Sequence, residues 1–80
     1  MSLHGLRVTL QPPDGAPFVE DAILTLATGA NGGEIYSGNG GFWIEVVDDP
    51  DADGGLRVAD FGWADGQRDH TIVDQVPITL

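Results

Sequence analysis

The sequence lacks cysteine and lysine, and no apolar run in it approaches the roughly 18 residues of a membrane span. Without cysteine, no disulfide can reinforce the small core of an 80-residue chain, which we expect to form one β domain over residues 1–80. The start of the chain has no basic stretch followed by an apolar one, so we expect no signal peptide. These absences predict a cytoplasmic protein, or one that leaves the cell by a route other than ordinary secretion, such as inside a virus particle.

Basic residues are almost absent as well. Only Arg7, Arg57 and Arg68 stand against 13 acidic residues, and the formal net charge is −10. Such a surface repels nucleic acid and anionic lipid, and it attracts cations or the basic patch of another protein. Solubility alone is the competing explanation for this charge. We therefore expect a protein partner, with no direct binding of nucleic acid and no membrane association.

Twelve glycines and five prolines separate short apolar runs, a pattern typical of strands joined by turns. Apolar and polar side chains alternate over residues 6–11 and 56–58. Over residues 42–47, Phe42, Ile44 and Val46 alternate with Trp43, Glu45 and Val47, which also indicates a strand. The last segment, residues 72–80, carries Asp74 on its apolar parity, which predicts a bulge or break there, and Pro77, which predicts a sheet edge. The fold class is therefore all-β: a small antiparallel β-sandwich or a partly open barrel of about six short strands.

The alternation also predicts which side chains form the core. These are Leu6, Val8, Leu10, Leu24, Leu26, Phe42, Ile44, Val46, Leu56 and Val58.

Residues 17–28 fit two structures. Ala22, Leu24 and Leu26 share one face of a strand, which is the structure that we favour. Pro17 at a first turn and Gly29 at the end would also suit a short helix, which gives an α+β fold as the alternative.

Four segments follow one another in a familiar order: a strand, an Asp-Gly-x-Pro turn, a strand opening with alanine, and a Gly-Phe strand after a polar turn. They are Val8 with Leu10, Asp14-Gly15-Ala16-Pro17, Ala22-Ile23-Leu24-Thr25-Leu26 and Asn39-Gly40-Gly41-Phe42-Trp43-Ile44. This order resembles the transthyretin-like or carboxypeptidase-regulatory-like (Ig-like) β-sandwich modules over about half the chain. The short length and the acidic stretch after Phe42 depart from them. The resemblance implies an accessory module for structure or binding, as in bacterial surface proteins and in phage tail and head-decoration proteins, without catalytic residues.

The most specific local motif begins at Asp49. Asp49, Asp51 and Asp53 alternate, and Asp60 is twelfth in the series. This is the spacing of an EF-hand calcium loop, in which position seven, here Gly55, supplies a backbone carbonyl. We expect strands rather than helices on both sides, so the alternative is an acidic hairpin turn without metal. The motif predicts either one Ca²⁺ ion or no cofactor.

Catalytic chemistry has little support in the sequence. His4 lies near the N-terminus, His70 lies in a polar segment, and the serines lack a glycine elbow. We therefore expect no enzyme. Trp43, on the face opposite Phe42, and Trp63, in a turn-like stretch, are candidate interface anchors, with a place in the core as the alternative.

Three functions remain open. The first is a non-enzymatic structural or protein-binding module of a larger assembly, most simply a phage virion component such as a head-decoration or tail-associated protein. A homo-oligomer is one form that this assembly could take. The second is a small acidic inhibitor in the cytoplasm that imitates nucleic acid, as some anti-CRISPR proteins do. The third is a Ca²⁺-stabilised surface binding module.

Overall fold

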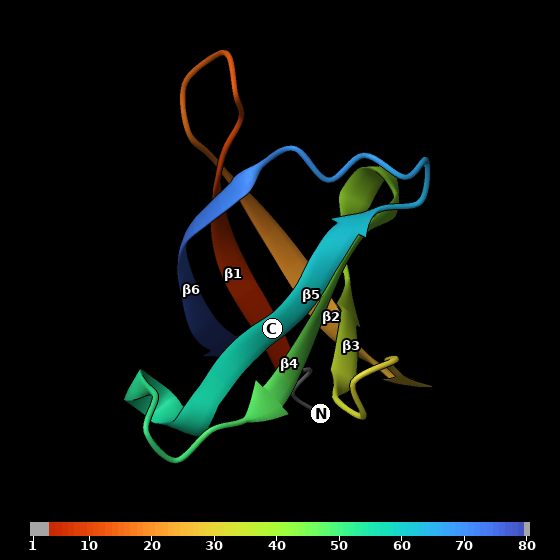
Figure 1. The fold of residues 1–80 in the computed structure, drawn as a ribbon, viewed down its shortest axis with the longest axis vertical. Helices are drawn as coiled ribbons and strands as arrows, with labels where there is room; N and C mark the ends of the chain where they lie inside the picture. The colour runs from red at the N-terminus through yellow and green to blue at the C-terminus, as the bar shows by residue number, and fades with distance from the viewer. Residues whose placement is uncertain (1–3, 80) are drawn as a thin grey trace.

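The computed structural model describes residues 4–79, apart from the side chain of Asp53, and shows six antiparallel strands in one curled sheet (Figure 1). The strands are β1 (His4–Gln11), β2 (Phe18–Thr28), β3 (Glu34–Ser37), β4 (Phe42–Asp48), β5 (Leu56–Trp63) and β6 (Thr71–Thr79). Short 3-10 turns, η1 (Asn39–Gly41) and η2 (Asp53–Gly55), precede β4 and β5. The all-β prediction is confirmed, and of its two forms the structure takes the partly open barrel.

The order of strands across the sheet is β5-β4-β3-β2-β1-β6. Each strand from β1 to β4 pairs with the next one along the chain, as short turns dictate. Residues 64–70 then cross one end of the half-barrel, so that β6 pairs with the free side of β1 (Figure 1). Pro77 therefore lies on an edge strand, as predicted, because proline has no N–H to donate to a second neighbour.

Both edge strands carry a bulge. In the pairing of β1 with β6, Thr9 faces Asp74 and Leu10 faces Ile72, so Val73 is the extra residue and the predicted irregularity beside Asp74 is confirmed. The pairing of β4 with β5 shifts in the same way after Glu45, which leaves Ala59 as the extra residue. Such bulges hinder the addition of a further strand at either edge.

Residues 18–28 form a strand, and the helix alternative for this segment is wrong. β2 lies inside the sheet and pairs with β1 on one side and β3 on the other. The two ladders take up its backbone groups over residues 18–24, whereas a helix of this length has marginal stability by itself. The long-range pairing therefore decides a segment whose local sequence fits both structures.

The core fills the concave side of the curled sheet. Six of the predicted side chains are buried there: Leu6, Val8, Leu10, Phe42, Ile44 and Val46. Leu24 and Val58 are half-buried and pack against this core, also as predicted. Ala22 and Tyr36 belong to the buried cluster as well, although the sequence did not predict them. Tyr36 comes from the four-residue β3, which is too short to show an alternation.

The prediction that Leu26 belongs to the core is wrong, because its side chain is fully exposed. It has the same parity as the core residue Leu24, but the regular pairing of β2 with β3 is interrupted after Leu24. The parity of a residue decides to which face of the sheet its side chain points. It does not decide whether other side chains cover that face at that position. Leu56 is half-buried like Leu24 and Val58, but it is not among the side chains that pack against the buried cluster.

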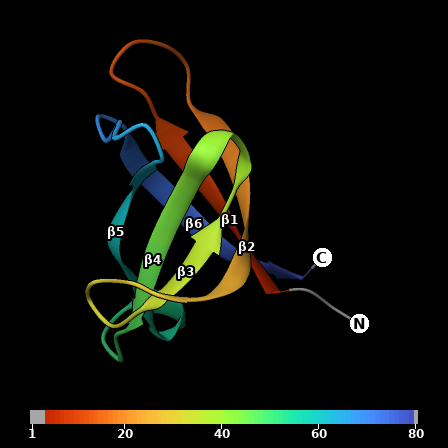
Figure 2. The same cartoon turned by 90° about the vertical axis from the view of Figure 1, so that its right-hand side faces the viewer.

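The connecting loops gather at the two ends of the half-barrel (Figure 2). Residues 12–17 and 64–70 lie at one end, and residues 29–33 and 49–55 lie at the other. Within residues 4–79, no helical segment is long and apolar enough to cross a membrane.

Candidate functional site

The acidic stretch after β4 forms a hairpin turn. The N–H of Asp49 donates to the carbonyl of Gly55 over 2.8 Å, and the Asp49 carboxylate accepts from the N–H of Asp51 over 3.0 Å. Its second oxygen lies 3.4 Å from Nε of Arg57. The carboxylate of Asp49 and the carbonyl of Gly55 are thus engaged within the hairpin itself.

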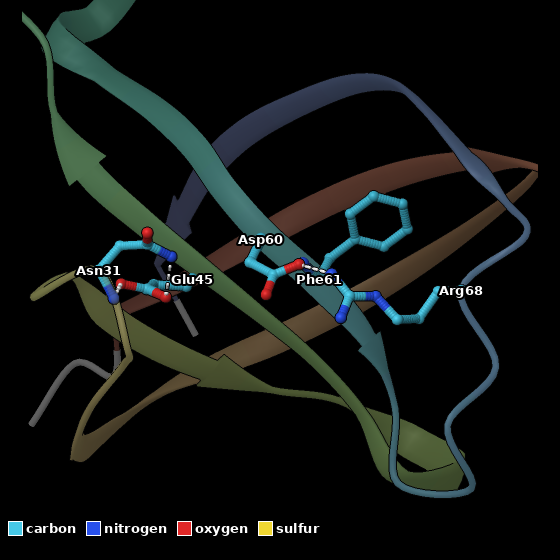
Figure 3. Close-up of polar contacts among 5 residues, drawn as sticks. All are labelled: Asn31, Glu45, Asp60, Phe61 and Arg68. Carbon is cyan, nitrogen blue, oxygen red and sulfur yellow. Dashed lines mark hydrogen bonds and ion pairs between the residues drawn. The ribbon is translucent and has the colours of Figure 1, made fainter.

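Asp60 lies apart from this turn, inside β5, where it faces Glu45 on β4. Its carboxylate accepts the N–H of Phe61 over 2.9 Å and forms an ion pair with Arg68 from the segment that crosses the barrel end (Figure 3). Asp49 and Asp60 therefore bind two different arginines. No group of three or more potential metal-ligating side chains comes together within the part of the chain that the structure describes.

The calcium hypothesis stays a prediction, because the side chain of Asp53 lies outside the described residues. A Ca²⁺ ion bound by Asp49, Asp51 and Asp53 would stabilise the folded state, by about 2.7 kcal/mol at one hundred times its dissociation constant. Thermal melts in millimolar Ca²⁺ and in chelator measure this. Identical melting curves would remove the site, and Asp51→Asn is the variant that should abolish any difference.

Trp43 lies on the outer, convex side of the sheet, opposite the side of Phe42, as predicted. It pairs with Ser37 on β3 and Gly62 on β5, and it is half-buried. A methyl group on Gly62 would approach the indole ring of Trp43 to 3.4 Å. The ring therefore lies over the backbone of β5, with part of its surface open to solvent.

Trp63 ends β5 and packs against the core, rather than standing in a turn. Its ring centroid lies 5.0 Å from that of Phe42 and 4.4 Å from that of His70, which in turn meets the edge of Phe18 at 5.7 Å. His70 is fixed by a contact of 3.0 Å between its Nδ1 and the carboxylate of Asp69. This aromatic row closes one end of the barrel, and the role of either tryptophan in an interface stays a prediction.

Glu45 is the one charged residue among the buried residues of the described chain, and the sequence reasoning missed it. Its carboxylate accepts hydrogen bonds from the backbone N–H of Asn31 (3.0 Å), the Asn31 amide (3.0 Å) and the N–H of Gly33 (2.8 Å) (Figure 3). A methyl group on Gly29 would overlap this carboxylate. Glu45 thus fastens the loop between β2 and β3 to the outer side of β4. Two features of the sequence could have indicated this role. Glu45 is an acidic residue among apolar ones, and the glycine-rich residues 29–33 offer backbone N–H groups that can surround a carboxylate.

Arg7 and Asp21 form a two-pronged ion pair on the outer side of β1 and β2. Nε of Arg7 lies 2.8 Å from Oδ1 of Asp21, and Nη2 lies 3.0 Å from Oδ2. Chiefly through these hydrogen bonds, Arg7 holds the pKa of Asp21 below its ordinary value, while desolvation acts in the opposite direction.

The pKa of Asp21 should rise toward its ordinary value in the Arg7→Gln variant. A lowered pKa in the folded state adds stability above the unfolded pKa, and this stability is lost as the pH falls through the folded pKa. The variant should therefore lose this part of the acid dependence of unfolding. An NMR titration of the Asp21 carboxyl group measures the pKa directly. Arg57→Gln is the control, because Arg57 pairs with Asp49 and should leave Asp21 unchanged.

One small cavity lies between the two edges of the sheet. It is lined by Leu6, Val46, Gly54, Leu56, Gln75 and Pro77. Its volume of about 40 Å³ is far below the roughly 300 Å³ at which ligand pockets begin. The lining of the cavity is mainly apolar.

No protein-family model, curated protein sequence or solved structure matches this chain. The likeness to transthyretin-like modules therefore stays a resemblance of turns and strands.

Proposed function

We propose that this chain is a non-enzymatic protein-binding module that works as a component of a larger assembly. The observation that carries the proposal is the number of large apolar side chains left exposed on so small a protein. They are Phe18, Val19, Ile23, Leu26, Val73 and Val76. Exposed apolar groups that lie together mark contact surfaces, since their burial by a partner is favourable.

The charge supports a protein as the partner. Each of the three arginines is paired with an aspartate: Arg7 with Asp21, Arg57 with Asp49 and Arg68 with Asp60. The remaining carboxylates have no arginine to balance them, and this field repels nucleic acid and anionic lipid. In a phage particle, one of the settings in which the resembled modules occur, the partner would be another coat or tail protein.

Two further features support a role without catalysis. The cavity between the sheet edges is too small for a substrate. The buried carboxylate of Glu45 already accepts three hydrogen bonds from its own chain, which commits it to holding a loop.

The proposal is tested by retaining partners from the native source on immobilised protein at about 50 and 200 mM salt. A packed apolar contact should retain its partner at both concentrations, because the hydrophobic effect is little screened by salt. If a small molecule is instead consumed and no macromolecule is retained, the proposal is wrong.

The same experiment separates the module from an inhibitor that imitates nucleic acid. Such an inhibitor should lose most of its partner between the two salt concentrations, as nucleic acid does. It should also carry its carboxylates on one face. Here Asp14 and Asp65 belong to the loops at one barrel end, and Glu34 and Asp51 lie at the other.

A further inference from the structure

We infer that the outer face of β6, β1 and β2 is the docking surface of this protein, and that it takes a protein segment whose apolar side chains are flanked by lysine or arginine. This inference rests on the proposed function, and it adds the place and the chemistry of the contact.

The strand register places nine residues on this face in three rows. The rows are Ile78–Gly5–Ile23, Val76–Arg7–Asp21 and Asp74–Thr9–Val19, each running from β6 through β1 to β2. We call these nine residues the outer grid. The three strands lie side by side, with β6 at the sheet edge (Figure 1).

The apolar members of the outer grid are open to solvent although they stand on regular strands. Val19 is 55% exposed, Val76 47% and Ile23 40%. Together with the half-buried Ile78 they surround the central ion pair. Burying them against a partner removes apolar area from water without any rearrangement of the sheet.

The centre of the outer grid is charged but already neutralised. Arg7 and Asp21 bind each other through two parallel hydrogen bonds of 2.8 and 3.0 Å. A partner can therefore cover them without leaving an unpaired charge, which is the costly case for buried ions.

Charge complementarity selects the kind of partner. Asp74 is the only charged side chain of the outer grid outside the central pair, and it is exposed at one corner. A lysine or arginine on the partner would meet it there. A second copy of this chain is a poor occupant, because each copy carries a net charge of −10 and its arginines are already paired with aspartates.

The test places the photo-reactive amino acid p-benzoylphenylalanine at Val76, inside the outer grid, or at Leu26, which is exposed outside it. Each protein is irradiated in extract from the native source, and the cross-linked segment is identified by mass spectrometry. We expect cross-links from position 76 and not from position 26, to a segment that carries apolar residues with lysine or arginine.

That segment, made as a peptide, then serves as the probe in binding measurements. Val76→Lys should weaken binding by about tenfold or more, as loss of an apolar anchor and repulsion of a basic partner both predict. Leu26→Lys, the matched control, should change it by less than about twofold. Melting curves of both variants should match that of the unaltered protein, since both positions are exposed.

The outcomes separate the two proposals. Cross-links from position 26 alone would keep a binding module but overturn the outer grid as its surface. Cross-links from position 76 to a second copy, or to a segment without basic residues, would overturn the stated partner chemistry. If neither position captures a protein, this inference is wrong. If the pull-down also retains nothing, the proposed binding function is wrong as well.

Discussion

Replacing Phe42 with alanine should lower the free energy of unfolding by about 3–5 kcal/mol. Phe42 is fully buried, begins β4 and packs against the ring of Trp63. The loss includes the apolar area removed from water and the cavity left where the ring was. Since small domains have total stabilities of about 5–15 kcal/mol, much of the Phe42→Ala protein should be unfolded at physiological temperature. Urea denaturation followed by circular dichroism measures the change.

Leu26→Ala is the matched control for this result. Leu26 is fully exposed in the structure, so its truncation should change the free energy of unfolding by less than about 0.5 kcal/mol. Equal losses in the two variants, or an unchanged melting temperature for Phe42→Ala, would mean that the concave side of the sheet is not the core.

Replacing Glu45 with alanine should have the second large effect and lower the free energy of unfolding by about 2–4 kcal/mol. Hydrogen bonds to a buried charged group are stronger than neutral ones, and the substitution leaves their donors unpaired. The N–H groups of Asn31 and Gly33 lose their acceptor, and the loop between β2 and β3 loses its attachment to β4. Amide hydrogen exchange should therefore speed up first at Asn31 and Gly33.

Two variants control for Glu45→Ala. Glu45→Gln keeps the shape and one acceptor oxygen, so it should lose less stability than Glu45→Ala. Glu34→Ala removes an exposed carboxylate from the neighbouring strand and should change stability by less than about 0.5 kcal/mol. An unchanged hydrogen-exchange rate at Gly33 in Glu45→Ala would contradict the role of this carboxylate in holding the loop.

The candidate site could be read from the sequence only in part. The series Asp49, Asp51, Asp53 and Asp60 is visible as a spacing, and that spacing implies a compact loop only if the chain coils around one point. Here Asp60 continues along β5 and meets Arg68, while Asp49 meets Arg57. Arg57 lies across the same hairpin as Asp49, whereas the position of Arg68 depends on the path of residues 64–70.

The outer grid could not be predicted from the sequence either. Val19, Ile23 and Val76 each look like ordinary strand residues, and only the pairing of β1 with β2 and β6 brings them to one face. The bulge at Val73 shifts the parity of β6, so that Ile72 packs on the core while Val76 faces solvent. A one-residue shift moves every following side chain to the other side of a sheet.

The sequence by itself determined the all-β class, the strands around Val8, Ile44 and Val58, the edge position of Pro77 and the acidic charge. These follow from period-two alternation, turn residues and composition, which are local properties of the chain. Only the tertiary structure decided that residues 18–28 are a strand, that Leu26 lies outside the core, and that Glu45 is buried. Each of these depends on which segments of the chain become neighbours, because burial and hydrogen-bond partners are supplied by residues distant in sequence.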